Sequence, residues 1–275
     1  METSCKILLD SIIDGIRVTS FELVMPKIML AEFNTHRVFS RSTSSIRAIP
    51  NSKILEYVNF TPDSFRKNCP GMQPKEKLST VREIFARGLY EAAKLSAVFF
   101  SSLLSSIGVH KEQCNRLIEP FLYVKTILTT TELENFFALR THEDAQFEIR
   151  TLAKMMMYEY DRSNPVAREI HLPYADFIDD SDLIINIRCS VARCARVSYF
   201  NNDGTRDIEK DLKLYDRLVG STPIHASPAE HQVMSRAFLI KNNAKLYTKK
   251  VDVKSLNGNL APGLVQYRKL IEGYE

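Results

Sequence analysis

The chain has 275 residues, of which 44% are apolar, and its formal net charge at pH 7 is +4. This length and apolar content suffice for a substantial hydrophobic core in one large domain or two small ones. The small net charge, without long blocks of one sign, argues against a surface that coats nucleic acid and favours small anionic ligands.

The cysteines and the N-terminal residues indicate the compartment. The five cysteines are odd in number and form no Cys-x-x-Cys pair, which favours reduced thiols over a disulfide framework or a zinc site. Only a few apolar residues lie between Lys6 and Asp10, so the sequence shows no signal peptide there. No run reaches the ~18 apolar residues that a membrane span requires. We therefore expect a cytoplasmic protein that binds no metal and does not enter a membrane.

The first part of the chain predicts a hairpin, an irregular connection and a long helix. Residues 6 to 33 have the pattern of a hairpin with Asp14-Gly15 at its turn, and the apolar run Met25–Phe33 predicts a strand at its end. Several prolines predict an irregular connection over residues 49 to 74, which we expect to form part of the wall of the ligand-binding site. A long helix is then predicted over residues 76 to 107, with Leu78, Val81, Phe85, Leu89 and Ala92 on one face.

The remaining residues predict helices alternating with short strands. Apolar residues at steps of three and four predict a second long helix over residues 131 to 160. The run Leu183–Ile187 predicts a strand, residues 207 to 219 a helix, and residues 231 to 275 a strand, a Pro262-Gly263 turn and a short terminal helix. Together these elements predict an α+β fold with an antiparallel sheet flanked by long helices.

Residues 34 to 48 form the most informative segment. They include three arginines, one histidine and six hydroxyl-bearing residues, but no acidic residue. Guanidinium groups bind phosphate oxygens in a planar fork, and hydroxyl and main-chain N–H groups fill the remaining acceptor sites. The segment therefore predicts a binding site for a nucleotide phosphate, with a solvated basic loop as the alternative.

The spacing within this segment resembles a signature of flavin-dependent thymidylate synthases. That family has Arg-His-Arg, two residues, Ser, one residue, Asn-Glu, one residue, Ser, one residue and Arg-Tyr. The matching residues are His36, Arg37, Ser40, Ser45 and Arg47. The differing residues are Thr35, Ser42-Thr43 and Ala48.

Four further segments are similar to the same family. The most specific is an Asn-Phe-x-x-Leu-Arg helix that runs into Ala-Gln-x-Glu-Ile, preceded by an arginine shortly before a proline. The segments are Arg116 with Pro120, Asn135–Arg140 with Ala145–Ile149, Ala195–Tyr199, and His225–His231. In the family the last two segments precede the Arg-His-Arg loop, whereas here they follow it. We interpret the chain as a single catalytic domain, residues 1–275, whose segment order is circularly permuted.

The resemblance implies an enzyme that methylates dUMP to dTMP. Methylenetetrahydrofolate would supply the carbon unit and reduced FAD the hydride, and NADPH would regenerate the reduced flavin. It also implies a homotetramer with sites shared between subunits. By position, Ser45, Arg47, Arg116 and Arg140 match substrate-binding residues. His36, Arg37, Asn135, His225, Ser227 and Glu230 match cofactor-binding residues.

Within this implied site, Arg140 has the catalytic role. It would lie against the pyrimidine, where a fixed cation stabilises negative charge developing on the ring. No His/Asp pair near Ser45 in the sequence marks it as an activated nucleophile, so we assign Ser45 to substrate binding. A loop-capping role is the alternative for His225, and we expect His231 to be a buried histidine with satisfied hydrogen bonds.

The departures from the family pattern concern charge. The family has Asn-x-Arg where this chain has Thr129–Thr131, so one cation is missing there and another at Thr35. Glu32 replaces a glutamine and adds negative charge. We expect weaker flavin affinity or compensating lysines from elsewhere, and a change of substrate from dUMP to dCMP is an alternative. A nucleotide-binding protein without catalytic activity and a nucleic-acid-binding module are the alternatives from other classes.

Overall fold

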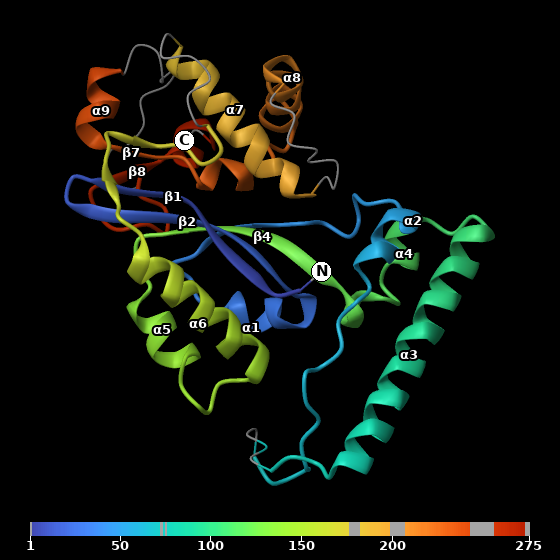
Figure 1. Ribbon diagram of the computed structural model, residues 1–275. Helices are drawn as coiled ribbons and strands as arrows, with labels where there is room; N and C mark the ends of the chain where they lie inside the picture. The colour runs from blue at the N-terminus through green and yellow to red at the C-terminus, as the bar shows by residue number, and fades with distance from the viewer. Residues whose placement is uncertain are drawn as a thin grey trace.

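Two β-sheets organise the molecule, a computed structural model that describes residues 2–71, 74, 76–175, 182–198, 207–242 and 256–272 (Figure 1). The larger sheet has the strand order β3-β4-β2-β1-β5, and the smaller has the order β6-β7-β8. Every pairing is antiparallel except that of β1 with the short β5 (Val166–Ala167). The structure confirms the predicted α+β fold with a mainly antiparallel sheet.

The predicted N-terminal hairpin is present. Strands β1 (Ser4–Ile13) and β2 (Ile16–Pro26) meet at Asp14 and Gly15, whose φ angles of 49° and 80° suit a tight hairpin turn. The strand predicted within Met25–Phe33 is wrong beyond Pro26, since η1 (Lys27–Met29) and α1 (Leu30–Phe33) follow. Met29 and Phe33 are four residues apart and both buried, so a helical turn places both side chains in the core.

One face of the larger sheet packs against two helices. Phe21, Leu23 and Met25 of β2 join one core with side chains of α5 (Glu134–Arg140) and α6 (Phe147–Arg162). The single helix predicted over residues 131 to 160 is therefore wrong in its middle. The hydroxyl of Thr141 donates to the carbonyl of Phe137, and residues 141 to 146 then separate the two helices.

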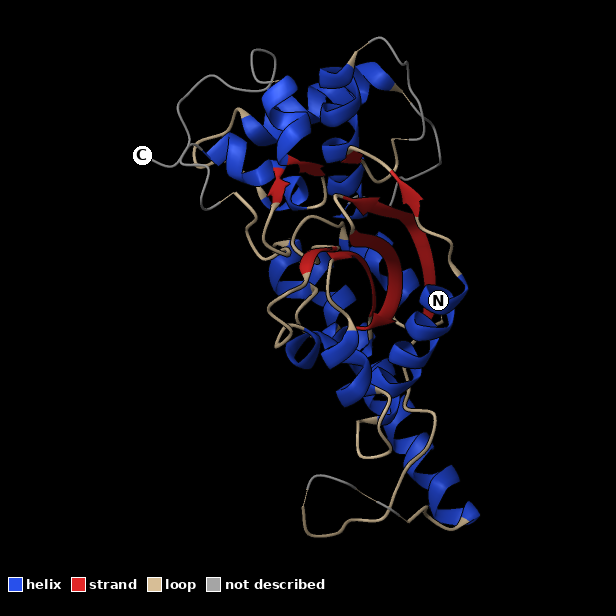
Figure 2. Cartoon of the chain, turned by 90° about the vertical axis from the view of Figure 1, so that its left-hand side faces the viewer, coloured by secondary structure: helices blue, strands red, loops and turns tan. Residues whose placement is uncertain are grey.

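The predicted long helix is confirmed as α3 (Thr80–Ser106), but it does not cover the sheet. It extends away from the sheet, and its C-terminal half contacts two short helices, α2 (Asn51–Ile54) and α4 (Lys111–Cys114) (Figures 1 and 2). Tyr90 in its N-terminal half packs against Phe65 and Phe121. Val81, Phe85 and Leu89 on its predicted apolar face are 78%, 68% and 59% exposed. None of the helices in the described ranges has the length and apolarity needed to cross a bilayer.

The connection predicted to be irregular over residues 49 to 74 contains local helix. Pro50 directly precedes α2, and η2 (Leu55–Tyr57) follows α2. A second short connection contains η3 (Glu119–Phe121) and leads into β4 (Tyr123–Thr130), which pairs with β2 and with β3 (Ser40–Thr43). The prolines thus mark helix starts as well as irregular backbone.

The smaller sheet lies against helices from the second half of the chain. Its strands are β6 (Ile170–His171), β7 (Val233–Ser235) and β8 (Leu264–Gln266). The helices of this half are α7 (Leu183–Ala195), η4 (Arg196–Ser198), α8 (Ile208–Val219), η5 (Ser227–Glu230), α9 (Arg236–Lys241) and α11 (Tyr267–Glu272). Of these, η4 and η5 also contact strands of the larger sheet. The predicted helix over residues 207 to 219 and the short terminal helix are confirmed.

The strand predicted at Leu183–Ile187 is wrong, because this run begins α7. The carboxylate of Asp182 accepts hydrogen bonds from the N–H groups of Ile184 and Ile185 at 2.9 and 3.2 Å, which caps a helix. Ile187, Val191 and Ala195 recur every four residues and are buried in the core of the smaller sheet. Tertiary burial of this face overrides the strand propensity of isoleucine.

Candidate active site

The segment predicted to bind anions is folded mainly as β3 and the turns around it. Because strand side chains alternate, Ser40 and Ser42 point inward and are buried, while Arg41 and Thr43 are on the other face. The hydroxyls of five of the six predicted residues make hydrogen bonds within the protein, namely Thr35, Ser40, Ser42, Thr43 and Ser44. The segment's arginines are therefore better placed than these hydroxyls to meet an anion.

Arg140 lies beside the start of this segment, so the structure brings two of the predicted site residues, Arg140 and His36, into contact. Its Nε donates to Nε2 of His36 at 2.9 Å, its Nη2 donates to the hydroxyl of Thr35 at 3.4 Å, and its Nη1 forms an ion pair with Glu32. Residues more than a hundred positions apart in the chain thus meet. They lie near the C-terminal end of β4, where the hydroxyl of Thr130 donates to the carbonyl of Val38, two residues after His36. The three partners fix the guanidinium plane in one orientation.

His36 must be neutral in this arrangement. Its Nε2 accepts the Arg140 hydrogen bond, so the ring proton is assigned to Nδ1. Burial, and then the positive charges of Arg140 and Arg41, lower the pKa of His36 to about 4. The imidazole therefore supports Arg140 without adding a second positive charge near neutral pH.

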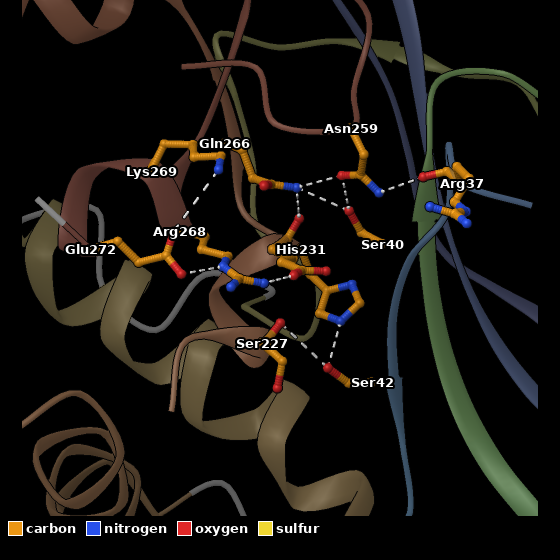
Figure 3. A network of polar contacts seen from close by, with 11 residues as sticks. Arg37, Ser40, Ser42, Ser227, His231, Asn259, Gln266, Arg268, Lys269 and Glu272 are labelled. Atoms are coloured by element: carbon orange, nitrogen blue, oxygen red, sulfur yellow. Dashed lines mark hydrogen bonds and ion pairs between the residues drawn. The ribbon is translucent and has the colours of Figure 1, made fainter. Parts of the chain in front are cut away.

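Arg37, Phe39 and Arg41 of the same segment line a pocket of about 690 Å³. Its charged lining comes from residues far apart in sequence, and it has more cations than acids (Figure 3). The lining residues are Arg37, Phe39, Arg41, Glu230, Asn257, Gly258, Asn259, Gln266, Arg268 and Lys269. Such a pocket suits the phosphate end of a nucleotide.

Two arginines from the predicted segment face this pocket in different states. Arg41 is half-buried and donates to the main-chain carbonyls of His36 and Phe33 at 2.9 and 3.4 Å. Burial, and the nearby charge of Arg37 to a smaller extent, lower the pKa of Arg41 although Glu230 opposes this shift. Within the described residues no ion pair engages the Arg37 guanidinium, so its N–H groups are available to a ligand.

The C-terminal wall of the pocket is joined to β3 by an amide network (Figure 3). Gln266 Nε2 lies within 2.9 to 3.1 Å of the Ser40 hydroxyl, the Glu230 carbonyl and Asn259 Oδ1. The Ser40 hydroxyl donates to Asn259 Oδ1 at 2.8 Å. Gly258 has a φ of +60°, and a Cβ there would lie 2.3 Å from Gln266 Oε1, so only glycine fits this close approach.

His231 is a buried histidine with satisfied hydrogen bonds, as predicted. Its Nε2 lies 2.9 Å from the Ser42 hydroxyl, and its Nδ1 lies 3.0 Å from the Thr129 hydroxyl. Since the Ser42 hydroxyl donates to the carbonyl of Ser227 at 3.5 Å, we assign the ring proton of His231 to Nε2. Burial lowers the pKa of His231 to about 3.

The same chain of hydrogen bonds continues to a second buried histidine. The Thr129 hydroxyl contacts that of Ser20, which lies 2.8 Å from Nε2 of His171, and Nδ1 of His171 lies 2.8 Å from the Ser11 hydroxyl. If each group donates to the next in the order Ser11, His171, Ser20, Thr129, His231 and Ser42, every donor has an acceptor. Both imidazoles are then neutral and carry their proton on Nε2. Burial also lowers the pKa of His171 to about 3. This chain joins the two sheets directly beside the pocket.

The other predicted substrate-binding residues lie at the opposite end of β4. Arg47 is exposed and forms an ion pair with Glu112 at 2.9 Å, and Arg116 pairs with Glu119 at 3.2 Å. An eight-residue strand spans about 25 Å, so these arginines are not in the Arg140 cluster of the same chain. Ser45 is half-buried on the same side as Arg47.

The structure separates the predicted cofactor-binding residues as well. Arg37 and Glu230 line the pocket, and His36 lies in the adjoining Arg140 cluster. Asn135 is exposed on the first turn of α5, and the exposed residues His225 and Ser227 do not line the pocket. Tyr199, the end of the predicted Ala195–Tyr199 segment, lies outside the described residues.

Several pocket residues were not predicted from the sequence. Arg41 stood in the quoted segment without a role, whereas Asn259, Arg268 and Lys269 had no motif that marked them. The adjacent charges Arg268-Lys269 on a short terminal helix were the single available signal. Over the described residues, no cluster of three or more His, Cys, Asp or Glu residues has the arrangement of a metal site.

The fold and this pocket define an α+β protein with a cationic site formed by its larger sheet and C-terminal segment. A family model described as thymidylate synthase complementing protein matches residues 15–166, more than half of the chain, and the chain belongs to this family. The matched range contains both the predicted loop and the Asn135–Arg140 helix, so the predicted family is confirmed. Residues 195 to 231 lie outside it, and the permuted segment order stays a prediction.

Solved structures similar to this chain include UMP/dUMP methylase PolB from Streptomyces cacaoi. The form bound with 5-Br UMP is 15% identical, with a TM-score of 0.49 over 58% of this chain and 89% of that chain. The form bound with 5-Br dUMP is 18% identical, with a TM-score of 0.45 over 53% of this chain and 67% of that chain. No curated protein sequence matches the chain.

Proposed function

We propose that this protein methylates a pyrimidine nucleotide at C5, converting dUMP to dTMP. Methylenetetrahydrofolate would donate the carbon unit and reduced FAD the hydride, with NADPH regenerating the reduced flavin. The observation that supports this proposal best is the fixed Arg140 beside His36, within the residues that match the family. Flavin and folate supply the hard chemical steps, and the protein binds and orients the reactants.

The residues of the pocket fit a phosphate-bearing cofactor. Arg37, Arg41 and Arg268 converge on a volume of about 690 Å³, and Arg37 retains donors that no described residue uses in an ion pair. Arg37, the predicted cofactor-binding cation of this pocket, would hold a phosphate of FAD. Glu230 orients Arg268 through an ion pair. Asn135, His225 and Ser227 stay proposed cofactor-binding residues, which reach a flavin from outside this pocket.

Arg140 would act on the pyrimidine. Its guanidinium is held by His36 and Glu32, so its direction is set before the substrate binds. A preorganised cation stabilises negative charge that develops on the ring as C5 attacks the carbon donor, and loses little energy in reorganisation. His36 stays neutral because of its low pKa and leaves Arg140 as the cation of this cluster.

Glu32 bears on which pyrimidine is accepted. Its carboxylate accepts from Arg140 and therefore offers an acceptor beside the ring site, which an amino group on the base satisfies. This observation supports dCMP as the alternative substrate. It also supports the alternative of a nucleotide-binding protein without catalytic activity, because Glu32 reduces the charge that Arg140 presents.

We further propose a homotetramer with shared active sites. Ser45, Arg47 and Arg116 lie at one end of β4 and Arg140 at the other, so one nucleotide reaches both groups if two subunits contribute. The apolar side chains of α3, which are exposed within the chain, suit a buried position between subunits. Ser45, Arg47 and Arg116 of one subunit would then hold the phosphate of a nucleotide whose ring faces Arg140 of another.

Complementation tests the shared site. Arg140→Ala, which should turn over slowly, and Arg116→Ala, which should bind the nucleotide weakly, are each purified, mixed, allowed to exchange subunits, and assayed at a nucleotide concentration too low for either variant alone to be active. Sites with both arginines intact form in the mixture if each site uses two subunits, so we expect activity to return. Light scattering gives the mass of the assembly in parallel. A mixture that stays inactive although mixed tetramers have formed would place all four residues in one subunit.

Cofactor binding and turnover test the proposed reaction. Purified protein is titrated with FAD and followed by flavin fluorescence. The bound flavin is then reduced with NADPH in the absence of oxygen, and dUMP or dCMP is added with methylenetetrahydrofolate. We expect saturable FAD binding at or below roughly tens of micromolar, equivalent to about 6 to 7 kcal/mol, and flavin oxidation with one of the nucleotides. Nucleotide binding without flavin binding would instead identify the non-catalytic alternative.

A further inference from the structure

The pocket beside β3 is completed by a helix that the family match does not include. Arg268 and Lys269 are on α11, beyond residues 15–166, yet they line the pocket with Arg37 and Arg41. Their side chains are 34% and 20% exposed, so both are partly shielded from solvent while still facing the pocket. Two segments more than 220 positions apart thus place four cations around one volume.

The position of α11 is fixed by the preceding strand. Gln266, the last residue of β8, hydrogen-bonds to Ser40 and to the carbonyl of Glu230, and Tyr267 N donates to the carbonyl of Gln232. Gly258 allows the 256–260 turn to approach Gln266 without a steric clash. Because these contacts lie one to two residues before Arg268, the cations have a defined place.

The acidic groups near these cations do not cancel them within the pocket. Glu230 is the one acid among the lining residues, and it forms an ion pair with Arg268. Glu272 accepts from Arg268 Nε at 2.6 Å and lies 3.9 Å from Lys269 Nζ, but it does not line the pocket. The lining therefore keeps an excess of positive charge that an anionic ligand can neutralise.

We propose that Arg268 and Lys269 bind the phosphate groups of a nucleotide ligand in this pocket. The proposal rests on the proposed function, because that function requires a phosphate-bearing cofactor. The phosphates come either from the dinucleotide cofactor or from the pyrimidine nucleotide, and both sources share the chemistry that the guanidinium fork recognises.

Calorimetric binding of ADP, inorganic pyrophosphate and dUMP tests the proposal without any flavin or turnover. ADP stands for the diphosphate half of the cofactor and dUMP for the substrate. We expect Arg268→Gln to raise the dissociation constant of ADP and pyrophosphate about 10- to 100-fold, the usual effect of losing a hydrogen bond to a charged group. Lys269→Gln should have a smaller effect in the same direction. Arg162→Gln, at an exposed position on α6, is the matched control and should leave both constants unchanged.

Glu272→Gln should change the ADP dissociation constant in the opposite direction to Arg268→Gln. Because a misfolded protein would not bind ADP more tightly, this variant also controls for misfolding. It removes the carboxylate that competes for Arg268 without touching the pocket lining, so ADP should bind severalfold more tightly. Weaker dUMP binding in Arg268→Gln, with ADP unchanged, supports the phosphate site but assigns it to the substrate. Unchanged binding of all three probes in both Arg268→Gln and Glu272→Gln overturns the proposal. Pyrophosphate binding that depends on Arg268, in a protein that binds no flavin, refutes the proposed function and leaves the phosphate site intact.

Discussion

The two ends of β4 place predicted arginines in opposite surroundings. At the C-terminal end, the Arg140 side chain is 18% exposed and contacts His36, Glu32 and Thr35. At the N-terminal end, the side chains of Arg47 and Arg116 are 66% and 55% exposed. Each of the three arginines has a glutamate partner, yet only Arg140 is held in one orientation by several groups.

The difference suggests two roles for these arginines: Arg140 presents a charge in a fixed orientation, whereas Arg47 and Arg116 attract an anion. A surface ion pair is worth about 0 to 1 kcal/mol, so Arg47 and Arg116 can exchange their glutamates for a phosphate at little cost. Arg140 lies in a less hydrated site where an oriented charge acts more strongly on a bound ring. The comparison assigns ring chemistry to one end of β4 and substrate attachment to the other, and the following predictions test it.

The largest expected effect is on stability at low pH, through the buried histidines at the Thr129 end of β4. His171 and His231 are neutral in the folded state because burial lowers their pKa values to about 3, whereas unfolded histidine takes up a proton below about pH 6.5. Their stabilising contribution is therefore complete above pH 6.5 and is lost as the pH falls toward 3. We expect these two histidines to lower the free energy of unfolding by about 5 kcal/mol between about pH 6.5 and 4.5.

Urea denaturation at several pH values measures this dependence. His231→Gln keeps a side-chain donor near Ser42 and removes one of three buried histidines with lowered pKa values, His36 being the third, so it should reduce their contribution to the slope by about a third. His142→Gln, at an exposed position, is the control and should leave the slope unchanged. NMR of the imidazole nitrogens checks the assigned Nε2–H form of His171 and His231, and protonated rings at pH 6 would contradict the hydrogen-bond chain.

The second effect concerns Arg140. Arg140→Ala should lower turnover by about 10²- to 10³-fold, the range for loss of one oriented donor to a transition state, and by more than it weakens nucleotide binding. Arg140→Lys should recover little, because a point charge does not reproduce the planar fork. Flavin oxidation by methylenetetrahydrofolate is measured with dUMP and separately with dCMP. Wild-type turnover of the Ala variant with whichever nucleotide is accepted would refute the electrostatic role.

The third effect is expected at the opposite end of β4. Arg47→Ala should weaken nucleotide binding by about 1.5 to 3 kcal/mol, with turnover at saturation nearly unchanged. Arg116→Ala should behave alike if both residues hold the phosphate. Equilibrium titration with dUMP and dCMP measures the constants. If Arg47→Ala reduced turnover more than it weakened binding, the two ends of β4 would not differ in function as proposed.

The smallest effect is expected for the glutamate partners of the exposed arginines. Glu112→Gln releases Arg47, so nucleotide binding should strengthen by less than about 1 kcal/mol, with no change in the melting temperature. Glu32→Gln, at the Arg140 end, is the informative comparison, because there the removed charge also alters the preference between dUMP and dCMP. Equal shifts in base preference from both variants would show that the preference does not depend on the Arg140 site.

Local chemistry made several elements predictable. Asp14 and Gly15 adopt positive φ angles that suit a hairpin turn, and the apolar periodicity of residues 76 to 107 predicted α3 to within a few residues. The Leu183–Ile187 run misled because strand propensity and a helical face are indistinguishable over five residues of which four are apolar. The cap at Asp182 and the burial of Ile187 decide for a helix.

The resemblance of residues 34 to 48 and of Asn135–Arg140 to the family predicted that His36 and Arg140 belong to one site. The pairing of Arg140 with Glu32 and the neutral state of His36 depend on geometry between distant segments, which no spacing rule encodes. The same holds for the inward-facing hydroxyls of β3, whose partners His231 and Asn259 lie about 190 and 220 positions further along the chain.

The sequence by itself determined the family, the elements with strong local signals and the residue types of the site, because these depend on neighbours within a few positions. Only the tertiary structure decided which cations share a pocket. Arg268 and Lys269 join Arg37 there because β8, held through Gln266, brings the C-terminal helix to β3. Long-range packing chooses such partners by burial and hydrogen-bond satisfaction, and neither quantity is written in local sequence.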